Sequence, residues 1–329
     1  MGCTFTQKQE DDFRQNIAAV DHKREGQQVI VSGCYLQAEP RGNIHYARKE
    51  DIPSLVEVLL AGKDFPGTIP STPPAAPLPF VAISEGCYGN CTFCSIRLAR
   101  GRHRSRPTAE ILADVRSAYA AHGSVKLVGQ EIAAYGRDTG SSLPALVRVI
   151  FAAIPDVRLE LGTLGAAWMK DMSEEDLTVF ADSRIHGNLH LPLQSASDSV
   201  LKAMRRGYTV EQFMTLLRTF RHHGITRFST DLIAGFPGET ARDHACNVSF
   251  LRSEAMAHAQ IFAYDPRPGT PAAAMAQVPR PLRVERTLEL IGVFLTHCDQ
   301  FIRNEKANPN DFLNTNLEIG NEKVEINEG

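Results

Sequence analysis

The sequence predicts an α/β protein built from parallel strands that alternate with helices. Two observations lead to this class. Short apolar, β-branched segments recur between residues 80 and 263, and amphipathic segments with helix-capping residues separate them. This alternation implies parallel pairing with right-handed crossovers, so a six-unit partial barrel and a doubly wound sheet both fit. Either fold places a functional site at the carboxyl ends of the strands.

Residues 1–62 precede this alternation and are predicted to form a small α/β domain. Helices are expected at 11–20 and 52–61, and a β-branched strand is expected at 28–32. The segment 63–79 is dense in proline and has no periodic apolar face. We therefore expect an extended linker there, which marks a domain boundary.

The alternating domain is expected over 80–280, with a C-terminal helix at 281–305. Its strands are predicted at 80–83, 125–128, 157–161, 189–193, 228–233 and 260–263. Its helices are predicted at 108–121 and after the capping residues Ser173, Thr209 and Thr240. The tail 306–329 is polar and acidic, so we expect it to be mobile.

The composition is that of an ordinary soluble protein. Hydrophobic residues make up 43% and charged residues 22%, and the net charge is only -3. No overall basic field therefore indicates nucleic acid, and any such contact must be local. The seven cysteines are an odd number, there is no signal peptide, and no apolar run reaches membrane-spanning length. These features predict a cytoplasmic protein without a membrane partner.

Three cysteines follow the first strand of the alternating domain. Cys87, Cys91 and Cys94 have the spacing C-x3-C-x2-C. In a reducing compartment, such a cluster indicates metal binding rather than a disulfide. Three thiolates can hold three irons of a cubane cluster and leave the fourth iron open. The alternative is a zinc site completed by His103.

The cysteine spacing, with the aromatic Phe93 before the last cysteine, resembles the signature of the radical S-adenosylmethionine (radical SAM) enzymes. The resemblance implies a partial (βα)6 TIM-like barrel that binds a 4Fe-4S cluster and S-adenosylmethionine. In that family the open iron chelates the amino and carboxylate groups of S-adenosylmethionine, and reductive cleavage yields a 5'-deoxyadenosyl radical. The protein would position and shield these cofactors, with Phe93 among the cofactor-binding residues.

Polar residues just past the strands are candidates for contacts with S-adenosylmethionine. Gly129 and Glu131 follow the second strand, and the Glu131 carboxylate is suited to its amino group. Gln194 and Ser195 follow the fourth strand and offer hydrogen bonds to the ribose or methionine end. Asp231 lies on the fifth strand. Because these strand ends converge, we expect the five residues to surround one site.

Basic residues provide a second group of candidates. Arg205 or Arg206 is suited to a bidentate pair with the carboxylate of the cosubstrate, and Arg205 is taken as the candidate. Five arginines lie between 97 and 106, beside the cysteines. Phosphate contacts would be their natural use, and a solvated loop is the alternative. For Arg205, Arg206 and Glu239 the alternative is likewise a solvated face.

Several ordered motifs narrow the resemblance to the methylthiotransferases. They are E-G-C-Y-G-N-C-T-F-C, A-A-Y-G-R-D, N-L-H-L-P-L-Q-S-A-S-D-S-V-L, S-T-D-L-I-A-G-F-P-G-E-T and P-R-P-G-T-P. The second and third look most like the archaeal and eukaryotic branch that modifies threonylcarbamoyladenosine in tRNA. That branch implies insertion of a methylthio group at the adenine C2 beside the anticodon. It also implies tRNA, a sulfur donor and an external one-electron reductant as partners.

The family further implies a second 4Fe-4S cluster held by three cysteines of an N-terminal domain. The sequence around Cys3 and Cys34 resembles the second and third ligand regions, whereas the first ligand region is not found. Either the sequence is truncated, or a group from outside the family pattern completes the second cluster, or that cluster is lost. The family's C-terminal RNA-binding module, TRAM, is not found either, which weakens the expectation of tRNA as substrate. Cys246 and Cys298 fall on predicted helices and are expected to pack. A radical enzyme acting on a protein side chain or small metabolite, and an inactive paralogue, are the alternative functions.

Overall fold

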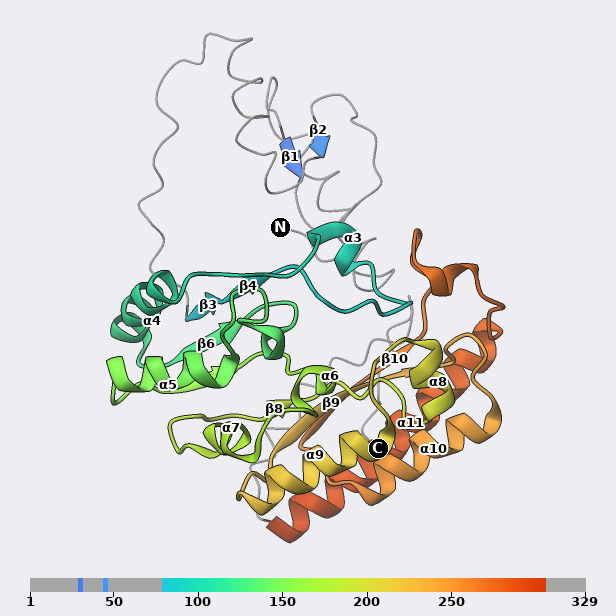
Figure 1. The fold of residues 1–329 in the computed structure, drawn as a ribbon. Coiled ribbons are helices and arrows are strands. Elements are labelled where there is room, and N and C mark those ends of the chain that lie inside the picture. The colour runs from blue at the N-terminus through green and yellow to red at the C-terminus, as the bar shows by residue number, and fades with distance from the viewer. Residues whose placement is uncertain (1–28, 32–43, 47–78, 306–329) are drawn as a thin grey trace.

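The computed structural model describes residues 29–31, 44–46 and 79–305 (Figure 1). The strands are β1 (Val29–Val31), β2 (Ile44–Tyr46), β3 (Phe80–Ala82), β4 (Ser84–Glu85), β5 (Arg104–Ser105), β6 (Val125–Val128), β7 (Leu159–Leu161), β8 (Leu189–His190), β9 (Phe228–Ala234) and β10 (His258–Ala263). The helices are α3 (Ile96–Arg100), α4 (Thr108–His122), α5 (Leu143–Ala153), α6 (Ala166–Met169), α7 (Glu174–Thr178), α8 (Asp198–Ala203), α9 (Val210–His222), α10 (Ala241–Ser253) and α11 (Arg280–Glu305). Short 3-10 turns are η2 (Ile132–Ala134), η3 (Val179–Ala181) and η4 (Pro271–Ala274).

Six parallel strands form an open barrel. Two three-stranded sheets have the orders β3-β6-β7 and β8-β9-β10. A parallel bridge between Thr163 and His190 joins them, and the Leu164 amide donates to the His190 carbonyl at 2.9 Å. The strands therefore follow one another in chain order, whereas a doubly wound sheet reverses its order midway. The prediction of a partial barrel is confirmed.

The core lies between the strands and the helices that cover their outer face (Figure 1). On β6, Val125 and Leu127 are buried, whereas Lys126 alternates with them and is half-buried. On β7 the alternation continues, and Glu160 Oε2 lies 3.6 Å from Lys126 Nζ. Burying one leucine contributes about 1.5–3 kcal/mol. The helix-facing residues thus stabilise the fold, while the interior face carries charge.

Capping residues fix several helix boundaries as the sequence predicts. Gly123 ends α4 in the left-handed conformation, with φ 70°. The Thr209 side chain accepts from the Gln212 amide in a complete capping box at the start of α9. Thr240 makes the same motif with Asp243 at the start of α10. These contacts are local, so the sequence alone specifies them.

The fourth predicted strand is shorter than expected. It was predicted over 189–193, yet β8 ends at His190. Pro192 has no amide proton to give to a ladder, and Gln194 has a left-handed backbone with φ 73°. The pairing resumes at Gln194, which bridges Leu232 on β9. This bend turns the residues beyond β8 toward the end of the barrel.

Several predictions lie outside the described residues. They concern Cys3, Cys34, the helices at 11–20 and 52–61, the linker up to residue 78 and the tail 306–329. The strand expected at 28–32 is observed as β1, which pairs in parallel with β2. Within the described ranges, no helix is both long and apolar enough to span a bilayer.

Candidate functional site

A two-stranded hairpin presents the three cysteines at the end of β3. β4 pairs with β5 in antiparallel fashion, and the loop between them carries the cysteines. Cys87, Cys91 and Cys94 line one pocket that opens to solvent. Burial raises the pKa of Cys87 to about 11 and that of Cys94 to about 12. Both are therefore protonated thiols without a metal, and metal binding would displace their protons.

The donor set fits a cubane cluster better than a zinc ion. Among the described residues, no three His, Cys, Asp or Glu side chains converge on one point where a single ion could sit. His103 is buried, its Nε2 lies 3.2 Å from Ser105 Oγ, and its ring stacks on Tyr88. Its Nε2 is thus engaged, and its Nδ1 is buried without a hydrogen-bond partner among the described residues; the ring does not join the cysteines in a group of metal ligands there. In a cubane each thiolate bonds a different iron, so the sulfurs need not meet at one point.

A half-buried arginine lies against the cysteine loop. Arg206 Nη1 lies 3.3 Å from Cys91 Sγ, and its Nη2 donates to the Pro192 carbonyl at 2.9 Å. Burial acts to lower the pKa of Arg206, but Tyr208 and Cys91 raise it above its ordinary value. The guanidinium therefore remains a cation next to the thiols. Arg205, the residue chosen from sequence, is instead exposed and has a left-handed backbone with φ 57°.

Glu131 is a buried carboxylate beyond β6. Its Oε1 accepts from the Gly165 amide at 2.8 Å and from the Ala133 amide at 3.2 Å. Burial raises its pKa to about 7. A Cβ on Gly165 would lie 2.0 Å from Glu131 Oε2, so only glycine allows this approach. A Cβ on Gly129 would have one contact at 2.8 Å, with Ser84 Oγ, so Gly129 serves close packing.

Two acceptor atoms, one beyond β8 and one on β9, are buried and have no hydrogen-bond partner among the residues that the structure describes. They are Gln194 Oε1 and Asp231 Oδ1. The other oxygen of Asp231, Oδ2, lies 3.4 Å from His190 Nε2, and His190 Nδ1 lies 3.1 Å from Ser229 Oγ. Buried acceptors normally have donors, so these two atoms fit a ligand with hydroxyl or ammonium groups. Sequence reasoning missed His190. The alternation of side chains along the neighbouring strands β8 and β9 places it on the same face of the sheet as Asp231.

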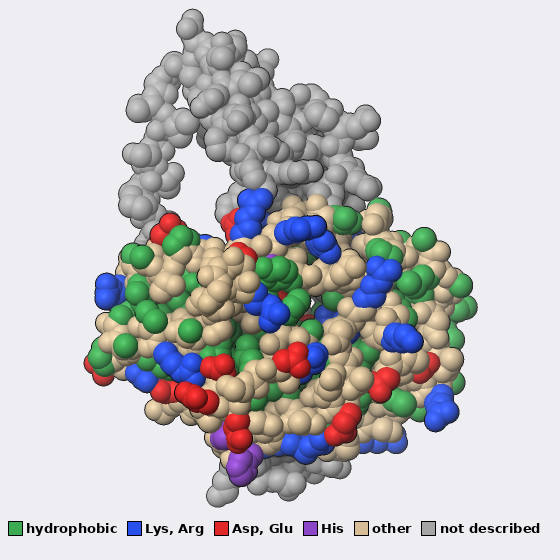
Figure 2. All heavy atoms as spheres, viewed as in Figure 1, with side chains coloured by type: hydrophobic (Ala, Val, Ile, Leu, Met, Phe, Trp, Pro, Cys, Tyr) green, Lys and Arg blue, Asp and Glu red, His purple; other side chains and the backbone are tan. Residues whose placement is uncertain are grey.

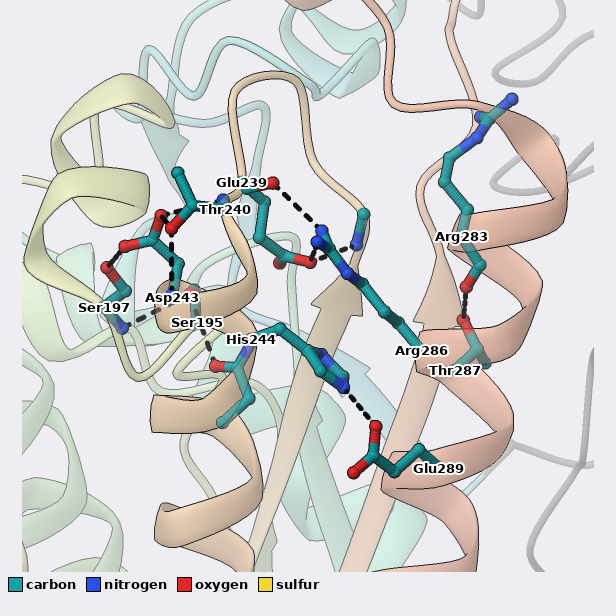
Figure 3. Close-up of polar contacts among 12 residues, drawn as sticks. Ser195, Ser197, Glu239, Thr240, Asp243, His244, Arg283, Arg286, Thr287 and Glu289 are labelled. Atoms are coloured by element: carbon teal, nitrogen blue, oxygen red, sulfur yellow. Dashed lines mark hydrogen bonds and ion pairs between the residues drawn. The ribbon is translucent and has the colours of Figure 1, made fainter.

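Ser195 belongs to a network that joins the end of β8 to α10 (Figure 3). Its Oγ lies 3.3 Å from Asn247 Oδ1, and the Ser197 amide donates to Ser195 Oγ at 3.3 Å. Ser197 Oγ in turn donates to Asp243 Oδ1 at 2.6 Å. The hydroxyl of Ser195 is fully buried. These contacts hold the strand end in place.

The first turns of α11 hold the end of β9. Arg286 Nη1 lies 2.8 Å from Glu239 Oε1 in a buried ion pair, and the same oxygen accepts from the Gly235 amide at 2.9 Å (Figure 3). Arg283 donates to the Tyr264 carbonyl at the end of β10. We call Arg286, Glu239 and Gly235 the α11 clamp. It fixes the loop that follows β9.

A second pocket adjoins the cysteines, and Phe93 is one of the residues that line it. Its lining residues include Phe93, Cys94, Ile233, Tyr264 and Arg267. It therefore lies between the cysteine loop and the ends of β9 and β10. Phe93 also packs against an apolar cluster that includes Ile233 and Tyr264. Cys246 is half-buried on α10 and packs against the core.

Comparison with known proteins identifies the superfamily. The Radical SAM superfamily profile matches residues 81–246. The chain is 33% identical over 319 residues to a threonylcarbamoyladenosine tRNA methylthiotransferase of Danio rerio, with 89% of this chain and 58% of that protein covered. It is 33% identical over 300 residues to a tRNA-2-methylthio-N(6)-dimethylallyladenosine synthase of Streptomyces griseus, with 83% and 59% covered. The chain thus spans less than two thirds of the length of these relatives.

One solved structure aligns with part of the chain. The radical S-adenosylmethionine methyltransferase TsrM from Kitasatospora setae aligns with a TM-score of 0.49 and 22% identity, over 60% of this chain and 38% of that one. The profile match covers half of the chain and contains the cysteine triad. The chain therefore belongs to the radical SAM superfamily, whose members bind the 4Fe-4S cluster and S-adenosylmethionine predicted from the cysteine spacing.

Proposed function

We propose that this protein is a radical SAM methylthiotransferase that modifies an adenosine beside the anticodon of tRNA. The target we infer is C2 of N6-threonylcarbamoyladenosine. The observation that carries the proposal is the likeness, over 89% of the chain, to an enzyme named for that substrate. The second group of relatives is named for another 2-methylthio adenosine in tRNA. Both groups support the same reaction class and the same kind of polymer.

In this proposal Cys87, Cys91 and Cys94 hold the cluster. When bound, the cluster and S-adenosylmethionine supply an organic radical that removes a hydrogen atom from an unreactive carbon. Arg206 holds Cys91 and the Pro192 carbonyl at once, so it fixes the cysteine loop relative to β8. It also keeps a positive charge next to the thiolates. Phe93 walls the adjoining cavity on the side of β9 and β10.

Glu131 would accept the ammonium group of S-adenosylmethionine. Its pKa of about 7 leaves it partly protonated at neutral pH, and a cation within contact distance favours the charged form. Gln194 and Asp231 offer the buried acceptors for ribose hydroxyls. Gly129 allows β6 to end close to β4, and Ser195 holds the end of β8. Arg205 remains a candidate for binding a phosphate or carboxylate group.

The remaining parts of the reaction need groups beyond this site. We propose that Cys3 and Cys34 contribute to a second 4Fe-4S cluster, through which a sulfur donor acts. An external one-electron reductant would supply the electron, and tRNA would be met in the cytoplasm. A second S-adenosylmethionine would provide the methyl group.

The test is anaerobic reconstitution of the wild type and of a Cys87→Ala/Cys91→Ala/Cys94→Ala variant. Iron and sulfide counting should give about eight irons in the wild type and about four in the variant if both clusters form. The wild type should cleave S-adenosylmethionine and convert an anticodon stem-loop that carries threonylcarbamoyladenosine to its 2-methylthio form, detected by nucleoside mass spectrometry. The variant should do neither.

Three outcomes would contradict parts of this proposal. Cleavage of S-adenosylmethionine by the triple variant would remove the cluster assignment. About four irons in the wild type would leave one cluster and exclude sulfur insertion through a second. Conversion of a dimethylallyladenosine stem-loop, with no conversion of the threonylcarbamoyl one, would change the substrate and keep the reaction class.

A further inference from the structure

Four side chains form a continuous stack at the mouth of the barrel, which we call the ring stack. The His103 and Tyr88 rings lie 4.9 Å apart with planes at 21°. The Tyr88 and Trp168 rings lie 5.7 Å apart and are tilted by 50°. The Arg137 guanidinium carbon lies 5.1 Å from the Trp168 ring. The order is therefore His103, Tyr88, Trp168, Arg137.

The ring stack is assembled from three separate strand-end loops. Tyr88 and His103 belong to the cysteine loop after β3, Arg137 follows β6, and Trp168 follows β7 on α6. Tyr88 directly follows Cys87, which lines the cysteine cavity. The stack thus lies at the entrance of the site. It plays no part in the reaction as proposed so far.

One end of the ring stack is rigid and the other is free. Ser105 Oγ, which contacts His103, donates to Asp138 Oδ1 at 2.6 Å and accepts from the Gly136 amide at 2.8 Å. Burial lowers the pKa of His103, so the ring is neutral and stacks without carrying charge. At the other end Arg137 is exposed, and Tyr88 keeps 37% of its surface accessible. The stack therefore offers aromatic surface to solvent on a fixed base.

The surroundings of the ring stack are basic. Arg102, Arg104 and Arg137 are exposed, and within the described part of the chain their side chains form no ion pair or hydrogen bond. Two acidic residues lie near these arginines: Asp138 is bound by Ser105, and Glu85 lies opposite Arg104 in the β4–β5 pair. Figure 2 shows Lys and Arg side chains, with some Asp and Glu side chains among them, around the hollow of the face that it draws. Unpaired cations next to exposed rings favour a polyanion with flat groups over an apolar protein surface.

We propose that the ring stack binds an unpaired nucleobase of an RNA loop, next to the base that enters the cysteine site. This inference rests on the proposed function and names the residues that would recognise the RNA substrate. RNA loops are recognised by stacking splayed bases on aromatic rings and on arginine planes, while nearby cations contact the phosphates. Arg137 ends the ring stack and supplies the open plane, the exposed part of Tyr88 and the half-buried Trp168 lie beside it, and Arg102 and Arg104 supply the charge.

The experiment measures binding of an anticodon stem-loop to the reconstituted holoprotein over a range of salt concentrations. Tyr88→Ala and Trp168→Ala should each weaken binding about 10- to 100-fold, with an unchanged slope against salt. Tyr88→Phe and Trp168→Phe should restore most of the affinity. Arg102→Gln should lower the salt slope by about 0.7, because it removes one phosphate contact to a single strand.

An abasic stem-loop identifies the partner of the stack. Removing the base that neighbours the target adenosine should weaken binding by the wild type. It should not weaken further the already reduced binding by the Trp168→Ala variant. Phe80→Ala is the matched control, since Phe80 is 54% exposed at the opposite end of β3. Arg116→Gln on α4 is the control for charge. Iron content and thermal unfolding confirm that each variant folds.

Two results separate the inference from the function on which it rests. If the wild type binds and methylthiolates the stem-loop, but both alanine variants bind within about twofold of it, the ring stack is not the contact surface and the function stands. If the folded wild type neither binds nor modifies any stem-loop, the proposed function fails and the inference fails with it.

Discussion

Glu131→Gln is expected to remove a large pH dependence of stability. Burial raises the pKa of Glu131 from 4.5 to about 7, and the amides of Gly165 and Ala133 offset this only in part. A raised carboxyl pKa means that the charged form is less favourable in the fold than in the unfolded chain. The wild type therefore loses stability as pH rises from 4.5 to about 7. At about 1.4 kcal/mol per pH unit, the loss amounts to about 3 kcal/mol.

The glutamine variant keeps the acceptor and cannot ionise. Its free energy of unfolding, relative to that of the wild type, should rise by about 3 kcal/mol between acidic pH and about pH 8. The assay is denaturant unfolding of the metal-free, reduced protein at several pH values. Glu110→Gln is the control, because the Glu110 side chain is 60% exposed in its pair with Arg106, and it should shift by less than about 0.5 kcal/mol. A difference between Glu131→Gln and wild type that stays constant with pH would refute the reasoning.

Two further substitutions test the packing around the site. Gly165→Ala would place a methyl group 2.0 Å from Glu131 Oε2, and should lower the free energy of unfolding by about 1–3 kcal/mol in denaturant titrations. Gly292 lies on α11 with open space around it, so Gly292→Ala should instead be neutral or slightly stabilising. A loss of stability equal to that of Gly165→Ala would contradict the argument. Arg286→Met leaves the buried Glu239 carboxylate without its cation and should cost about 3–5 kcal/mol. Adding Glu239→Leu should recover part of that loss, and strictly additive losses would show that the pair is not coupled.

The parts of the fold set by neighbouring residues could be predicted from the sequence. The capping box of Thr209 and the left-handed Gly123 depend on a few adjacent residues, and both are found as predicted. α5 was not predicted, although Ser142 caps it and its buried residues Leu146, Val147 and Ile150 recur at helical spacing. β8 was predicted too long because Pro192 was read as part of an apolar strand.

In the candidate site, too, the features set by neighbouring residues could be predicted, and those set by distant residues could not. The cysteine spacing is local, so the triad and its family could be read directly. Whether Arg205 or Arg206 faces the cysteines depends on a left-handed turn at Arg205, which no pattern of side chains reveals. The pairing of Tyr88 with Trp168 joins two loops that are eighty residues apart in the sequence. Such contacts arise only when the strand ends meet.

The α11 clamp has a consequence for how the barrel opens under thermal fluctuation. Detaching α11 would strip the buried Glu239 carboxylate of its cation and would expose the ends of β9 and β10. The free energy of detaching this helix therefore includes the loss of the buried ion pair and the exposure of the core that the helix covers. The amide protons of the first turns of α11 should exchange with solvent as slowly as those of β9. Helix and strands would then unfold as one cooperative unit, although α11 follows the last strand in the chain.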